Sequence, residues 1–209
     1  MPYGGNDWLE ITKEEIIEPE LPICDPHHHY WDLRVERTPY GRYLLHELLD
    51  DINDHNITST VFIEARAMYS ADLEKSYKPV GEVEFVEGLS AASASGIYGK
   101  SRASASIIGH ANLNLGNKVE PILESLLEAS PKRFKGIRHI VALDDDKEVD
   151  SIPVYNLQEQ MNTKNFIDGA KVLSKMGLSF DSWMYFHQLP QLLNLAKEVP
   201  DLPIVIDHI

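Results

Sequence analysis

The sequence predicts an α/β fold built on a parallel sheet. Short runs of β-branched and aromatic residues alternate along the chain with amphipathic runs of helical spacing. Neighbouring parallel strands need long crossover connections, which helices usually supply, so this alternation predicts strand–helix units. A second observation supports the same class, because ionisable residues collect at one end of nearly every predicted strand.

Six strands are predicted. They are short apolar runs, such as Val61-Phe62-Ile63 in the second and Ile204-Val205-Ile206 in the sixth. Their length and composition are those of strands buried in a parallel sheet. In chain order the predicted strands cover residues 22–25, 57–65, 105–113, 134–140, 178–185 and 203–208.

Five helices are predicted between these strands. The first has leucines and an isoleucine at helical spacing, and the third carries its apolar residues on one face. Gly177 follows the fourth helix as a glycine that can end it in the left-handed conformation. The predicted helices cover residues 43–55, 80–94, 119–128, 166–176 and 189–199.

The chain length predicts one packed domain preceded by an arm. The chain has 209 residues, 43% of them hydrophobic and 25% charged, which is typical of a soluble globular domain. Residues 1–20 are polar and glutamate-rich, so we expect an N-terminal arm followed by a domain at 21–209. The long connection 141–164 contains three aspartates and is either functional, mobile or a solvated acidic flap.

Charge and composition exclude several classes of partner. Lys and Arg number 19 against 33 Asp and Glu, which gives a net charge of −14. So acidic a surface repels phosphate backbones and anionic lipids, so we expect no nucleic acid and no membrane as partner. No apolar stretch approaches the roughly 18 residues of a membrane span. Cys24 is the one cysteine, and nothing requires an oxidising compartment, so we expect a cytoplasmic location.

The first predicted strand leads into a run of three histidines. Side chains alternate between the two faces of an extended segment, so His27 and His29 point to one side while His28 points to the other. Two imidazoles on one face suit a divalent metal, and zinc accepts neutral imidazole nitrogen readily. The same run is also compatible with a polar strand end that binds nothing.

Ionisable residues at other strand ends extend this candidate site. Glu64 ends the second predicted strand, Arg138 lies near the end of the fourth, His187 follows the fifth and His208 ends the sixth. In a parallel barrel the catalytic residues sit at this face, because the strand-to-helix loops gather there. Each residue also has a structural explanation: Glu64 could pair with Arg66 or Arg138, and His208 could cap a helix. Their joint occurrence at strand ends favours one shared site.

The chain resembles the amidohydrolase-related, metal-dependent hydrolases with a TIM-barrel, or (β/α)8, fold. Within that family it is similar to the branch of sugar-lactone and dicarboxylate-lactone hydrolases. The resemblance spans residues 21–209 and follows the order of the family's motifs. The matching motifs are Asp25-x-His27-x-His29-x-Trp31-Asp32, Gly136-Ile137-Arg138, Leu178-Ser179-Phe180-Asp181 followed by His187-Gln188-Leu189, and Pro203-Ile204-Val205-Ile206-Asp207-His208.

This resemblance implies roles for the strand-end residues. It implies a divalent metal, most often zinc, held by His27, His29 and His187. His208 is then expected to assist near the water that the metal activates. Arg138 is expected to bind a carboxylate of the substrate. Apart from the resemblance, the position of Glu64 at the end of its strand makes it the second expected catalytic residue, supporting the metal centre or orienting Arg138.

The resemblance also implies that the barrel is incomplete. The family's pattern has an aspartate after the eighth strand, which ligates the metal and takes the proton from the attacking water. This chain provides about six of the eight strand–helix units, so we expect it to be a poor catalyst by itself. A complete barrel typically runs to about 250 residues. We therefore expect a C-terminally truncated hydrolase whose open edge at 203–208 is covered by missing sequence or by another chain in an oligomer.

The expected function is hydrolysis of a small carboxylated molecule. We expect a metal-dependent hydrolase that opens a lactone or a similar carboxylate-bearing cyclic ester. Two alternatives stay open at this point. One is a metal-dependent decarboxylase of the same superfamily, and the other is a catalytically inactive, truncated chain that acts in binding or assembly.

Overall fold

The computed structural model describes residues 11, 13–34, 40–146, 148–149 and 160–208. Most of the predicted arm, residues 1–10 and 12, lies outside the described residues, and residues 13–20 are irregular and mostly exposed. Part of the predicted connection 141–164 also lies outside them, at 147 and 150–159.

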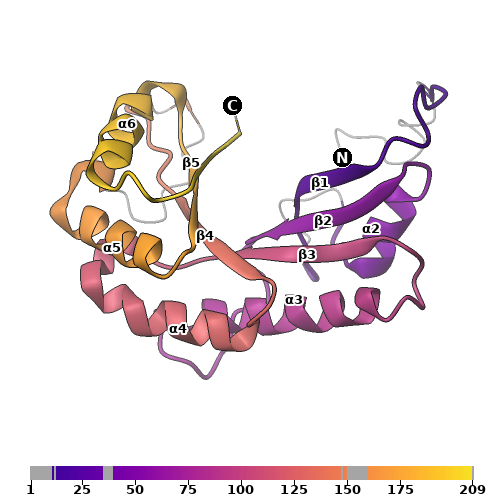
Figure 1. Ribbon diagram of the computed structural model, residues 1–209, viewed down its shortest axis with the longest axis horizontal. Helices are drawn as coiled ribbons and strands as arrows, with labels where there is room; N and C mark the ends of the chain where they lie inside the picture. Colours follow the sequence, from indigo (N-terminus) through magenta and orange to yellow (C-terminus); the bar gives the residue numbers. More distant parts are fainter. Residues whose placement is uncertain (1–10, 12, 35–39, 147, 150–159, 209) are drawn as a thin grey trace.

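Six parallel strands form one sheet, in the order of the chain. Each strand pairs in parallel with the next along the sequence, so the sheet winds in one direction and curls into an open arc (Figure 1). This confirms the predicted α/β class and the incomplete barrel. The strands are β1 (Ile23–His28), β2 (Ile57–Ile63), β3 (Arg102–Gly109), β4 (Phe134–Ile140), β5 (Ser179–Trp183) and β6 (Ile204–Asp207).

Helices connect the strands, as the alternating pattern predicted. Figure 1 shows α3 and α4 along one side of the arc, with α5 and α6 beside β4 to β6. None of the described helices has the length and apolar character needed to cross a membrane. The helices are α2 (Leu45–Ile52), α3 (Pro79–Ala94), α4 (Glu120–Ala129), α5 (Lys164–Lys175) and α6 (Leu189–Glu198), with short 3-10 helices η1 (Leu113–Val119), η2 (Gln160–Asn162) and η3 (Phe186–Gln188).

Apolar side chains of the strands and helices form one buried core. Helix α4 buries the apolar face that its spacing predicted, and Gly177 ends α5 with a φ of +71°. The apolar groups pack together, so polar side chains are left for the strand ends that carry the candidate site. The largest fully buried side chains include Phe62, Ile107, Leu123, Leu126, Phe134, Ile137, Phe166, Leu173 and Phe180.

The β6 edge of the sheet is apolar and open. Val205 and Ile206 are 48% and 45% exposed. A groove of about 540 Å³ runs between β6 and α6, and its lining is entirely apolar, including Leu189, Leu193 and Ile204. An exposed strand edge of this kind is a template for pairing with further chain. That another chain in an oligomer covers this edge stays a prediction.

Glu82 of α3 fixes the loop that follows β2. Its side chain is 1% exposed, and its Oε1 accepts the backbone N–H groups of Ala65 at 3.0 Å and Ala67 at 2.8 Å. Burial, together with the negative charge of Glu64, raises the pKa of Glu82 to about 8. The carboxyl group is therefore mostly protonated at neutral pH, and its carbonyl oxygen can still accept both hydrogen bonds.

Replacing Gly136 by alanine is expected to destabilise the protein by about 1–3 kcal/mol, because an added methyl group overpacks the β4–β5 contact. A Cβ at this position would lie 2.6 Å from the backbone oxygen of Ser179. Urea unfolding measures the change. The control is Gly88→Ala in α3, where a Cβ meets nothing within 4 Å and helix propensity favours alanine by up to about 1 kcal/mol. Equal stability of the two variants would contradict the tight β4–β5 packing.

Glu82→Gln is expected to remove part of the pH dependence of stability. The folded pKa of Glu82, about 8, lies above that of the unfolded chain, so the folded state holds a proton that the unfolded state releases. The free energy of unfolding of the wild type should therefore fall as pH rises from about 4.5 to 8, relative to that of the variant. Urea titrations at several pH values measure this difference. The control is Glu84→Gln, at an exposed position of the same helix. Parallel pH profiles for wild type and Glu82→Gln would refute the raised pKa.

Candidate metal centre and active site

A buried guanidinium lies at the centre of the candidate site. Arg138 of β4 is 3% exposed. Its Nε donates to Glu64 Oε1 at 3.2 Å, its Nη1 donates to Asp207 Oδ2 at 3.1 Å, and its Nη2 donates to the backbone oxygen of Glu64. Arg138 thereby joins the ends of β2, β4 and β6.

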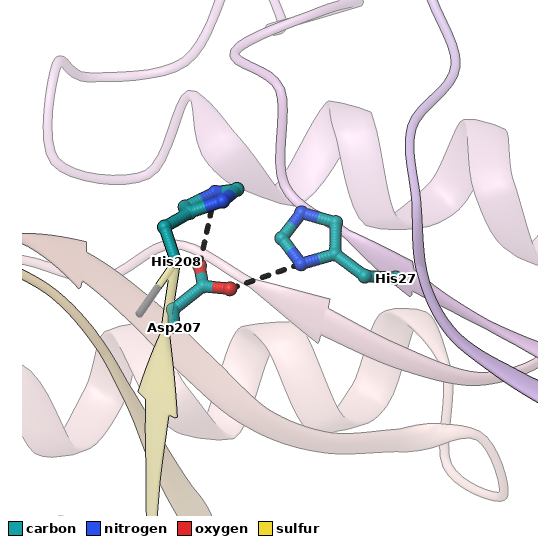
Figure 2. A group of neighbouring side chains, drawn as sticks. All are labelled: His27, Asp207 and His208. Carbon is teal, nitrogen blue, oxygen red and sulfur yellow. Dashed lines mark ion pairs between the residues drawn. The ribbon is translucent and has the colours of Figure 1, made fainter.

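Asp207 connects this ion-pair network to the histidines of β1. Its Oδ1 lies 3.0 Å from His27 Nδ1, and its Oδ2 lies 3.6 Å from His208 Nε2. Figure 2 shows the carboxylate at the end of β6, between the two imidazole rings. The ends of the two edge strands therefore meet through side chains.

The hydrogen bonds of His27 and His29 define which ring nitrogens carry protons. His29 Nδ1 lies 2.8 Å from the backbone oxygen of Ile63, which can only accept, so this nitrogen carries the hydrogen. The same reasoning assigns the hydrogen of His27 to Nδ1, which faces the carboxylate of Asp207. Burial lowers the pKa of His29 to about 4, so its ring is neutral at neutral pH.

In the neutral state that metal binding requires, the two Nε2 atoms face each other as hydrogen-bond acceptors. They lie 3.1 Å apart. Two nitrogens bound to one zinc at 2.0–2.1 Å in tetrahedral geometry would be separated by about 3.3 Å. Facing lone pairs repel unless a cation lies between them, so the arrangement of His27 and His29 fits a divalent metal.

A second set of ligand atoms shares His27. Ligand atoms of His27, Asp207 and His208 all lie within 4.8 Å of one another, the one such group of three found among the described residues. A neutral imidazole has one lone pair, so His27 cannot bind a metal in both arrangements at once. The hydrogen bond from Nδ1 favours the arrangement in which Nε2 meets the metal and Asp207 orients the ring.

The carboxyl groups of this site have opposite pKa shifts. Burial by itself would raise the pKa of Asp207, but the hydrogen bonds and charges of His27 and Arg138 outweigh it and lower the pKa to about 2. Asp181 of β5 is also buried, and burial raises its pKa to about 6. Burial lowers the pKa of His208, so its ring is neutral at neutral pH.

His28 points away from the site, as strand alternation predicted. Its Nε2 lies 3.2 Å from Ser104 Oγ, and its ring packs edge-on against Tyr30 and Phe62. Burial lowers the pKa of His28 to about 3. The three consecutive histidines are therefore divided between the core and the candidate site.

His187 has other partners in this structure. Its Nε2 lies 3.1 Å from the backbone oxygen of Leu143, and its Nδ1 lies 3.5 Å from Asp144 Oδ2. It does not belong to the group of potential ligands described above. The structure thus brings His27 and His29 together and places His187 against the connection after β4. Its role as a third metal ligand stays a prediction.

Arg138 and Glu64 form one unit. Glu64 pairs with Arg138, one of the two partners that its position at the strand end predicts. The guanidinium of Arg138 lies over the ring of Trp183, with its carbon 5.2 Å from the ring centroid. Three nitrogens of Arg138 already donate to Glu64 and Asp207. Direct binding of a substrate carboxylate by Arg138, and a catalytic role for Glu64, stay predictions.

Asp207 is the site residue that the sequence reasoning missed. Of the motif Ile206-Asp207-His208, only the histidine is predicted as a site residue, and Asp207 is predicted as part of the strand 203–208. Its position at the end of an apolar strand is the signal that could have identified it. Ionisable residues at strand ends were already the basis for selecting Glu64 and His208.

Comparison with known proteins supports the fold. No family model matches the chain. An uncharacterized protein of Sinorhizobium fredii, y4mH, is 24% identical over 206 residues, which cover 90% of this chain and 62% of that protein. The chain thus spans less than two thirds of the curated relative that it matches.

Two solved structures share the arrangement of strands and helices. One is an amidohydrolase from Burkholderia multivorans with bound zinc, at 20% identity and a TM-score of 0.58, covering 88% of this chain and 57% of that one. The other is a putative 2-pyrone-4,6-dicarboxylic acid hydrolase from Pseudomonas putida, at 13% identity and a TM-score of 0.55, covering 88% and 56%. The chain therefore has the α/β-barrel fold of amidohydrolases of known structure, and the resemblance that its motifs indicated is confirmed at the level of the fold.

Proposed function

We propose that this chain is a metal-dependent hydrolase of the amidohydrolase-related family that opens a lactone or a similar carboxylate-bearing cyclic ester. The observation that carries the proposal is the pair of Nε2 lone pairs of His27 and His29, which face each other at 3.1 Å. Two similar structures support it: one contains zinc, and the other is described as a putative hydrolase of a pyrone dicarboxylate.

In this proposal His27 and His29 hold the metal through Nε2, and zinc is the first candidate. A bound divalent metal supplies Lewis acidity, which polarises an ester carbonyl and activates water for attack near neutral pH. Asp207 holds His27 in the required tautomer, in the way that outer carboxylates orient histidine ligands. Arg138 and Glu64 in turn hold Asp207 in place.

His208 is the proposed proton acceptor. Its side chain is 47% exposed and lies beside Asp207, so it can reach both solvent and the reaction centre. Its lowered pKa keeps the ring neutral at neutral pH, which leaves a nitrogen free to take the proton of the attacking water. The negative charge of Asp207 then stabilises the imidazolium that forms.

His29→Ala is expected to lower zinc affinity by more than about 100-fold, because it removes one of the two facing nitrogens. Asp207→Asn should lower zinc affinity by about 10–100-fold, since it only weakens the orientation of His27. Zinc titration in competition with a chromogenic chelator measures both effects. The control is His55→Ala, an exposed histidine before the start of β2, at the opposite end of that strand from Glu64. A wild type that binds no zinc, or a His29→Ala variant that binds as well as wild type, would refute the metal centre.

The zinc-loaded chain is expected to convert carboxylated lactones, with 2-pyrone-4,6-dicarboxylate among the substrates tested, to ring-opened acids. Chelation should abolish turnover and added zinc should restore it. His208→Gln should lower kcat by about 100–10,000-fold, the usual range for loss of a general base, while zinc content stays unchanged. Product analysis separates the alternatives. Released carbon dioxide would favour the decarboxylase, and zinc binding without any turnover would favour an inactive binding protein.

A further inference from the structure

Two arginines lie at the loop that follows β2, at the end of the sheet that carries the candidate site. Arg66 follows Glu64 by two residues and is exposed. Its guanidinium forms no hydrogen bond or ion pair with the part of the chain that the structure describes. Arg34 reaches the same loop, where its Nη2 donates to the backbone oxygen of Ala65. Two positive charges therefore gather at one point of a strongly acidic chain.

The backbone of Arg66 is held in an unfavourable conformation. Its φ is +56°, in the left-handed region, which costs a non-glycine residue roughly 1–2 kcal/mol. Glu82 Oε1 accepts the N–H groups of Ala65 and Ala67, the residues on either side. The buried carboxyl group thus imposes the turn at Arg66. Backbone strain that is maintained in this way is concentrated at functional sites.

The backbone of Arg66 is three residues from a carbonyl group that contacts a proposed metal ligand. The ring of His29 is hydrogen-bonded to the backbone oxygen of Ile63. Three residues of fully extended chain span at most about 11 Å, so the Cα atoms of Ile63 and Arg66 are no further apart than that. Burial lowers the pKa of His139 on β4, and the charges of His110 and Arg66 lower it further. The positive charge of Arg66 therefore acts on His139 of β4 and on His110, which follows β3.

Arg138 is poorly placed to bind a carboxylate of the substrate. It is buried, and three of its nitrogens already donate to Glu64 and Asp207. A carboxylate that displaced either partner would leave that partner buried without its positive charge, which is costly. A guanidinium without a competing acid, at the surface of the same site, meets no such penalty.

We propose that Arg66, with Arg34 beside it, is the subsite that binds the carboxylate of the substrate, and that Arg138 is a positioning residue. This inference rests on the proposed function and assigns its substrate class to particular residues. The planar fork of a guanidinium matches the two oxygens of a carboxylate. Glu82 contributes by holding the turn that presents Arg66.

The test is Arg66→Asn in the zinc-loaded chain. Asparagine tolerates the left-handed conformation, so the variant should fold and hold zinc as the wild type does. Isothermal titration with 2-pyrone-4,6-dicarboxylate should show affinity at least about tenfold weaker, the loss expected for one strong charge-assisted contact. A neutral lactone should bind both proteins equally. Arg66→Lys should recover part of the loss, because lysine restores the charge without the fork.

The control is Arg102→Asn, at the start of β3 and so at the opposite end of the sheet. The guanidinium of Arg102 contacts only backbone oxygens of the preceding turn, so carboxylate affinity should be unchanged. Glu82→Leu removes the acceptor that holds the turn and should weaken carboxylate binding without loss of zinc. Glu82→Gln keeps that acceptor and should bind as the wild type does.

The outcomes separate this inference from the proposed function. Unchanged carboxylate affinity in Arg66→Asn overturns the subsite and leaves the metal-dependent hydrolase standing. A wild type that holds zinc but binds no carboxylate overturns the subsite and the carboxylated substrate class together. Equal loss of affinity for the carboxylate and for the neutral lactone overturns the subsite as well, because it indicates damage to the whole site.

Discussion

The contacts of Arg138 are the interaction on which the rest of the site depends. Transfer of a guanidinium to a buried position costs several kcal/mol unless carboxylates and hydrogen bonds compensate for its lost hydration. Glu64 and Asp207 provide that compensation from β2 and β6. Because Asp207 is held in this way, one of its oxygens is left to face His27 on β1. The position of the His27 ring thus follows from the burial of one positive charge.

The order of the strands explains why side chains, and not backbone hydrogen bonds, connect β1 to β6. In the described strands β1 and β6 are the two edges, and each pairs through its backbone with only one neighbour. The Asp207–His27 contact spans the open arc and brings both ends of the described chain into one site (Figure 2). A cation that binds only when His27 and His29 are in place would stabilise this arrangement by mass action. The proposed metal binding is therefore coupled to the curvature of the sheet.

Much of the fold could be predicted because local patterns of apolar and polar residues determine the strands and helices. Strand and helix positions agree with the structure to within a few residues, since each element has its own period of apolar residues. The opposite orientation of His28 and its two neighbours follows from strand alternation. Glu64 and His208 lie at the same end of the sheet because parallel strands end on the same side.

The sequence by itself determined which residues reach the end of the barrel, and only the tertiary structure decided which of them touch. Spacing along the chain predicts which face of a strand a side chain lies on and which end of the strand it is near. The distance between two strand ends depends on how far the sheet curls. For this reason Asp207 was overlooked, although it meets both His27 and Arg138. For the same reason His187, at an equivalent strand end, is found against Asp144. The strained turn at Arg66 likewise arises from a buried carboxyl group on a different helix, a long-range contact that no local pattern encodes.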